Sequence, residues 1–146
     1  SIILTVLLYG AQCWRMTKKD AHKLSTFHHT CLRTIIKIFW PDKISNTKLL
    51  QVTNQKTLDS MITKRRWKGL GHVIRMNPDI PAKTALTLTP EGKRKQGRPK
   101  TTWRRTMKSD LSAASLTWKT SLKIAQDRKA WKVLSEASCA TRHNEN

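Results

Sequence analysis

Cationic side chains are the groups of this sequence best suited to chemistry, and the densest run of them lies at positions 91–105. The cations of this run are Lys93, Arg94, Lys95, Arg98, Lys100, Arg104 and Arg105, and no acid follows Glu91 within it. Gly92 and Gly97 permit close backbone approach to a partner, and Pro99 stiffens the exit. We expect such a loop to lie along a phosphate backbone or to enter a narrow minor groove.

The centre of this loop, Gly97-Arg98-Pro99-Lys100, is similar to an AT-hook, in which an extended Gly-Arg-Pro core lies in the minor groove. Gln96 stands where that motif has a second Arg, so strict reading of A·T pairs is not expected. The alternative is a solvated loop that contributes only solubility. The concentration of charge favours contact with nucleic acid.

A second group of cations surrounds Trp67. It comprises Lys64, Arg65, Arg66 and Lys68, and Arg75 follows them on the same predicted helix. Four cations within little more than one turn cannot all face a core, so we expect these side chains to contact phosphates. Trp67 can stack on a base or pack inward as an anchor between helices, and packing is the favoured alternative.

The net charge extends this argument to the whole chain. Lys and Arg number 29 and Asp and Glu number 9, which gives +20. Self-repulsion of that size weakens a compact state unless an anionic partner neutralises it. We expect RNA or DNA as the partner, because each neutralised phosphate releases counterions. A membrane surface or an acidic protein is a weaker alternative, and no membrane partner is expected. The apolar run 2–8 is far shorter than the ~20 residues of a spanning helix, and we interpret it as the end of a core element of a longer chain.

Metal binding and catalysis find little support. The three cysteines, Cys13, Cys31 and Cys139, include no tightly spaced pair, which argues against a disulfide framework and fits a reducing cytoplasm or nucleus. His28 and Cys31 share one predicted helix face and Cys13 could join them, but zinc sites need paired ligands. We therefore expect a packed helix face, with no metal and no cofactor.

The polar residues that commonly catalyse reactions are also poorly arranged. His72 follows Gly71 with no neighbouring nucleophile or orienting acid, so packing or phosphate contact is favoured over catalysis. The acids are scattered singly, whereas two-metal phosphoryl transfer needs clustered carboxylates. No phosphate-binding Gly-x4-Gly-Lys-Ser/Thr and no Gly-x-Ser-x-Gly is present. We expect no active site in this chain.

Hydrophobic spacing predicts a mostly α fold, a small helical bundle in two lobes joined by a basic Gly/Pro loop. The expected parts are an N-terminal helical lobe at 1–88, a basic linker at 89–100 and a C-terminal helical segment at 101–146. Helices are expected over 17–38, over 46–52 from Ser45 or Asn46, over 57–76, from Thr101 or Thr102, and from Ser115 or Thr117 through Trp131. Thr17 and Asp20 resemble a capping box. Gly69 and Gly71 predict a kink or a close helix approach.

Five segments, taken in order and spacing, resemble one family. They are LLYGAQCW (7–14), CLRTI (31–35), RWKGLGHVIRM (66–76), GRPKTTW (97–103) and DRKAW (127–131). Together they resemble the C-terminal region of non-LTR (LINE-type) retrotransposon reverse transcriptases, and the resemblance covers nearly the whole chain.

The resemblance implies a parent protein with an endonuclease and an RNA-directed DNA polymerase, which cuts chromosomal DNA and primes reverse transcription on the nick. The catalytic motifs of both activities would lie upstream of Ser1 or be lost, so no catalytic residue is carried over. This segment would follow the polymerase thumb, contact the upstream polymerase domain and help to grip template RNA, target DNA or their hybrid, in the nucleus or the cytoplasm. The alternatives are a non-functional or repurposed remnant that acts as a free-standing basic DNA/RNA-binding protein, and a free-standing nuclease.

Overall fold

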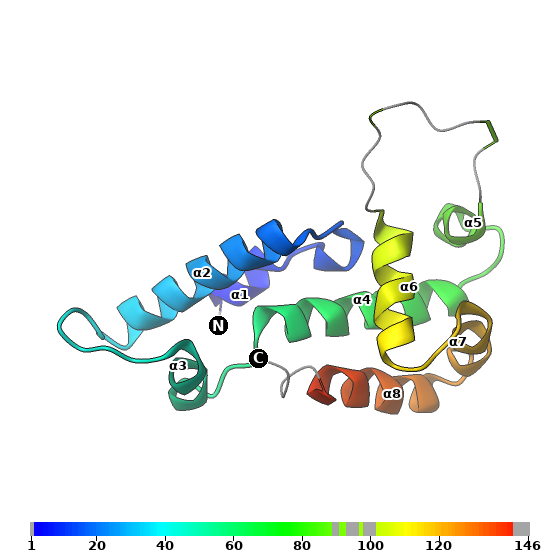
Figure 1. Ribbon diagram of the computed structural model, residues 1–146. Helices are drawn as coiled ribbons and strands as arrows, with labels where there is room; N and C mark the ends of the chain where they lie inside the picture. The colour runs from blue at the N-terminus through cyan, green and yellow to red at the C-terminus, as the bar shows by residue number, and fades with distance from the viewer. Residues whose placement is uncertain (1, 89–90, 93–96, 98–101, 142–146) are drawn as a thin grey trace.

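The described chain is built from helices. The structure is a computed structural model that describes residues 2–88, 91–92, 97 and 102–141, and within these residues there is no strand (Figure 1). The helices are α1 (Ile2–Leu7), the 3-10 turn η1 (Ala11–Cys13), α2 (Lys18–Ile35), α3 (Asn46–Val52), α4 (Leu58–Arg75), α5 (Pro81–Thr87), α6 (Trp103–Ala113), α7 (Trp118–Ile124) and α8 (Arg128–Thr141). The predicted mostly α fold and small helical bundle are confirmed.

Hydroxyl side chains begin most of the longer helices, because each accepts a hydrogen bond from a backbone N–H that has no partner within the helix. Thr17 and Asp20 form the predicted capping box: the Thr17 hydroxyl accepts from the Asp20 N–H at 3.2 Å, and the Asp20 carboxylate accepts from the Thr17 N–H at 3.0 Å. The Thr17 hydroxyl also donates to the Asp20 carboxylate at 2.6 Å, and this hydrogen bond, followed by the one from the Thr17 backbone N–H, lowers the pKa of Asp20. Ser45, Thr57, Thr102 and Thr117 cap α3, α4, α6 and α7 in the same way.

Two features of the helices were not expected. No helix was predicted between position 76 and Thr101, but Pro81 opens α5, since proline is tolerated at the first position, where an N–H would lack a partner. We expected one helix through Trp131, but the chain breaks between α7 and α8. At the break the Asp127 carboxylate accepts from the Lys129 N–H at 2.8 Å and starts a new helix.

The larger core lies along the second half of α4. Trp67 is fully buried and stacks on Trp131 of α8, with ring centroids 5.1 Å apart, and the Trp131 Nε1–H donates to the Trp67 carbonyl at 2.9 Å. The other buried members of this core are Leu70, Ile74, Leu86, Met107, Leu111 and Ala125. The prediction that Trp67 packs as an anchor between helices is confirmed.

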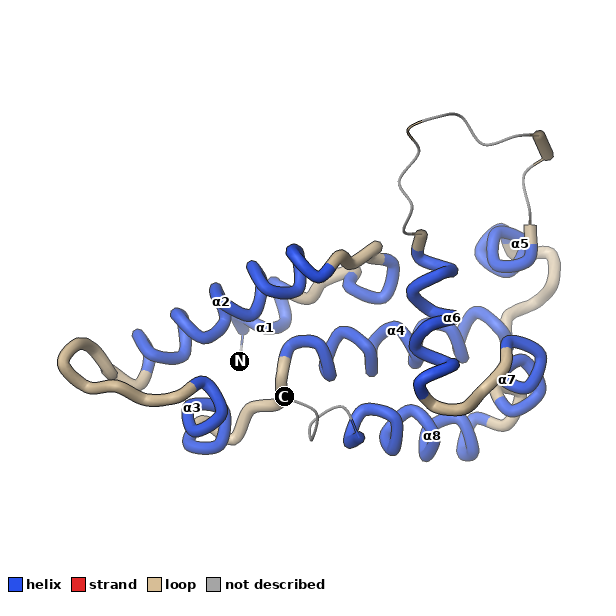
Figure 2. The backbone as a smooth tube through the Cα atoms, in the orientation of Figure 1, coloured by secondary structure: helices blue, strands red, loops and turns tan. Residues whose placement is uncertain are grey.

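The smaller core lies along the first half of α4, where Leu58 and Ile62 pack against Leu8 and Ala11. α4 therefore runs between the N-terminal helices on one side and α8 on the other (Figure 2). The larger core contains residues from before position 88 and after position 102. Most of the predicted linker 89–100 lies outside the described residues, and the division into two lobes at that point stays a prediction.

α8 approaches α4 closely at Gly71, which confirms the expected close helix approach. A Cβ atom at Gly71 would lie 2.3 Å from Trp131 Nε1, whereas a Cβ at Gly69 would lie 3.1 Å from Cβ of the exposed Gln12. The indole is buried and fixed by its hydrogen bond, so it has no room to move aside.

We predict that Gly71→Ala destabilises the fold by about 2 kcal/mol, because overpacking exceeds the gain in helix propensity. Gly69→Ala is the matched control in the same helix, and it should cost less, since a movement of a few tenths of an ångström relieves its 3.1 Å contact with Gln12 Cβ. Chemical denaturation followed by circular dichroism measures both changes. Equal stability of the two variants would contradict the close approach at Gly71.

Candidate nucleic-acid interface

The cations predicted around Trp67 do not form one exposed group. Lys64, Arg65 and Lys68 are exposed on α4, but Arg66 is only 3% exposed. The Arg66 guanidinium donates to the carboxylate of Asp110 on α6, which is itself 6% exposed. The prediction that Arg66 contacts phosphate is therefore wrong: successive helical residues turn by about 100°, which directs this side chain inward.

Three other arginines from the predicted set bind carbonyl groups at the C-terminal ends of helices. Arg65 donates to Leu8 O beyond α1 at 3.1 Å, and Arg75 donates to Ala125 O at the end of α7 at 2.6 Å. Arg104 donates to the carbonyls of Ala85, Leu86 and Leu88 around the end of α5, the shortest distance being 2.6 Å. The last carbonyls of a helix lack partners and carry partial negative charge, so these contacts stabilise the fold.

The cations of the Gly/Pro loop lie mostly beyond the described residues. Lys93, Arg94, Lys95, Arg98 and Lys100 fall there, so their contact with nucleic acid stays a prediction. Gly92 and Gly97 are described, with φ of 93° and 81°, backbone conformations that favour glycine. Arg105, the last cation of the run, is exposed on α6.

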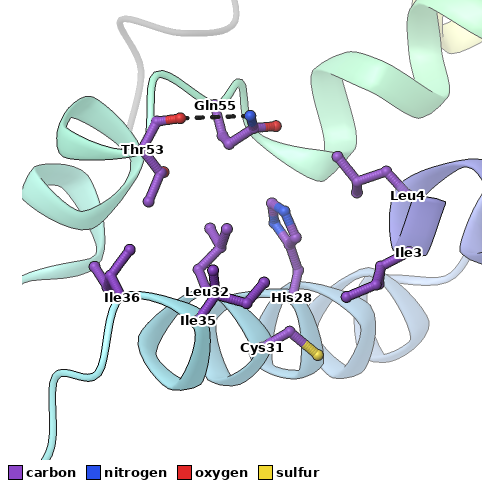
Figure 3. Close-up of a pocket in the computed structure, with 9 residues that line it drawn as sticks. All are labelled: Ile3, Leu4, His28, Cys31, Leu32, Ile35, Ile36, Thr53 and Gln55. Carbon is purple, nitrogen blue, oxygen red and sulfur yellow. Dashed lines mark hydrogen bonds between the residues drawn. The ribbon is translucent and has the colours of Figure 1, made fainter. Parts of the chain in front are cut away.

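The apolar face predicted around His28 and Cys31 lines a cavity of about 310 Å³ between α1, α2 and the residues after α3 (Figure 3). His28 points into it and is 3% exposed, and neither of its ring nitrogens has a hydrogen-bond partner among the described residues. Burial, and then the neighbouring His29, lower the pKa of His28. Within the described chain no three His, Cys, Asp or Glu side chains lie close enough to hold a metal ion.

Comparisons with protein-family models, with curated proteins and with solved structures found no match for this chain. In the part of the chain that is described, no helix combines the length and the apolar character needed to cross a membrane.

Exposed cations that the sequence patterns did not single out lie on α8. Arg128 and Lys132 are both exposed on this helix, which packs beside α4 and its exposed Lys68 (Figure 1). Periodicity within one helix identifies its outer face but not its neighbour, so no pattern in the sequence indicates that these cations belong together.

We predict that acid weakens the fold through His28. Because its folded-state pKa is lowered, the unfolded chain binds a proton first, so stability is present above about pH 6.5 and is lost as pH falls below it, by at most ~1.4 kcal/mol per pH unit. His28→Leu should remove this part of the loss and stabilise the protein by about 1 kcal/mol at pH 7. Denaturation curves from pH 7.5 to 5 measure this, with His22→Gln, an exposed change on the same helix, as the control. The same acid sensitivity in His28→Leu would refute the role of His28.

We also predict that the Arg66–Asp110 pair serves the fold and not the ligand. Asp110→Asn should cost about 3 kcal/mol, because it leaves a buried cation without its countercharge. The double variant Arg66→Met with Asp110→Leu keeps the net charge and should recover most of that loss. Denaturation measures stability, and fluorescence anisotropy with labelled RNA and DNA should give wild-type affinity for the double variant. A large loss of affinity in a stable double variant would contradict this prediction and indicate that Arg66 contacts the nucleic acid.

Proposed function

We propose that this chain binds the sugar–phosphate backbone of RNA or DNA and has no catalytic function of its own. The observation that carries the proposal is the excess of cations: 29 Lys and Arg against 9 Asp and Glu. If every acid were paired with one cation, 20 cations would still lack an acidic partner. A polyanion is the partner that neutralises such an excess with the largest gain from counterion release.

The distribution of charge supports the same proposal. Four arginines donate hydrogen bonds within the fold: Arg66 donates to Asp110, and Arg65, Arg75 and Arg104 donate to backbone carbonyls. Exposed cations such as Lys68 of α4 and Arg128 and Lys132 of α8 take no part in those contacts. Arginine suits internal contacts because its planar guanidinium offers five donors, and the exposed cations that make no such contact are left for an outside partner.

We further propose that the chain is the C-terminal nucleic-acid-binding region of a retrotransposon RNA-directed DNA polymerase. The support is the resemblance of the five sequence segments. In the fold, four of these segments meet. Trp103 Nε1–H donates to Gln12 O at 2.7 Å, Gly69 faces Gln12, and Trp131 packs on Gly71. Contacts between the segments favour the interpretation that they belong to one folded unit, as a shared ancestry requires.

We predict that affinity for nucleic acid falls steeply with salt, with a log–log slope of about −0.9 per phosphate contact on duplex DNA and about −0.7 on a single strand. Replacing Arg94, Lys95, Arg98 and Lys100 with Ala should make the slope shallower by about one of these increments per cation. Anisotropy titrations from 50 to 300 mM salt measure both quantities. Binding that does not change with salt would refute phosphate neutralisation. An unchanged slope in the variant would exclude the loop as a contact with nucleic acid.

A further inference from the structure

Two contacts set the register between α4 and the segment that packs beside it. At one end, Lys64 Nζ lies 3.7 Å from Glu136 Oε1 on α8. At the other end, Arg75 Nη1 donates to Ala125 O, just before α8, at 2.6 Å. Between these two contacts, Trp131 of α8 packs against Trp67 and Gly71 of α4, so going forward along α4 corresponds to going back along α8. The two segments run antiparallel, and both contacts lie along one side of the seam between them.

Of the exposed basic side chains between these contacts, four continue the faces of Lys64 and Glu136. On α4, Lys68 and His72 follow Lys64 at intervals of four residues and so share its face. On α8, Lys132 and Arg128 precede Glu136 at the same interval. The register places Lys132 opposite Lys68 and Arg128 opposite His72. We call these four residues the α4–α8 ladder.

Acids do not neutralise the ladder among the described residues. Glu136 is engaged by Lys64 at one end, and the Asp127 carboxylate accepts from the Lys129 N–H at the other. The described ion pairs, Lys64–Glu136 and Arg66–Asp110, use no member of the ladder. Lys68 and Lys132 therefore bring like charges together across the seam, which raises the energy of the free protein. An anion lying between the two helices relieves this repulsion from both sides.

We propose that the α4–α8 ladder binds one phosphodiester strand of a nucleic acid along the seam. The proposal rests on the proposed function and locates part of it. Successive rungs are about 6 Å apart along each helix, and packed helix axes lie about 8–10 Å apart. The strand is thus contacted from two sides. Lysine ammonium groups act as point charges and contacts to phosphate carry no base information, so this contact is independent of sequence. A single strand and one strand of a duplex present the same chemistry.

The experiment replaces the three permanent cations, Lys68, Arg128 and Lys132, with Ala. The matched control replaces Lys19, Lys43 and Lys48, exposed cations on α2, between α2 and α3, and on α3. Anisotropy with single-stranded RNA, single-stranded DNA and duplex DNA is measured from 50 to 300 mM salt. The ladder variant should bind on the order of a hundredfold more weakly than the wild type at 0.15 M salt, and its slope should be shallower by about 0.9 per cation on duplex or 0.7 on single strands. The control should stay close to the wild type.

A third variant, Glu136→Gln, removes the acid at the end of the ladder and frees Lys64, so affinity should rise up to about fivefold at 0.15 M salt. Unchanged thermal melting of all three variants establishes that they fold. The nucleic acid whose salt dependence changes most in the ladder variant is the one that the seam binds. If the wild type binds well and the ladder variant matches the control, the ladder is excluded and the proposed function survives. If the wild type binds no nucleic acid, both proposals fail.

Discussion

The stack of Trp67 on Trp131 is the contact on which the rest of this fold depends. It is possible because Gly71 has no Cβ, so that the indole approaches the α4 backbone and donates its N–H to the Trp67 carbonyl. This contact sets the spacing of α4 and α8. The buried side chains of α5, α6 and α7 then complete the same core. Because the stack fixes both helices, it also fixes which exposed side chains face one another across their seam.

The arginines of this protein illustrate how a very basic chain stays folded. Arg65, Arg75 and Arg104 bind carbonyls at helix C-termini, where the helix dipole favours a cation. Arg33 of α2 bridges to the start of α3 instead, by donating to Ile44 O at 3.2 Å and to Asn46 Oδ1 at 2.7 Å. Arg66 pairs with Asp110 inside the core. Part of the positive charge is thus compensated by the fold itself, which limits the self-repulsion that a charge of +20 creates.

Features that depend on a few neighbouring residues could be predicted from the sequence, and features that depend on distant ones could not. The caps at Thr17, Thr57 and Thr102 bind an N–H three residues ahead, so local spacing reveals them. The burial of Trp67 and the close approach at Gly71 also followed from local composition. The inward direction of Arg66 depends on Asp110, 44 residues away, and the pairing of α4 with α8 depends on a contact across 64 residues. Only the folded chain supplies that information.

The two proposed contacts with nucleic acid differ in their energetics. Contact through the loop uses the backbone of a Gly-Arg-Pro segment as well as its cations. Lys68, Arg128 and Lys132 stand on helices that the tryptophan stack already holds in place, so ordering them on binding costs only side-chain freedom. Rigid cations at regular intervals suit a uniform backbone, whereas an extended Gly-Arg-Pro segment suits the shape of a groove. If both contacts operate, the helices would supply sequence-independent affinity and the loop would supply the preference for a particular form of nucleic acid. Neutralisation by either contact would also stabilise the folded state, because only the folded chain holds the cations in this arrangement.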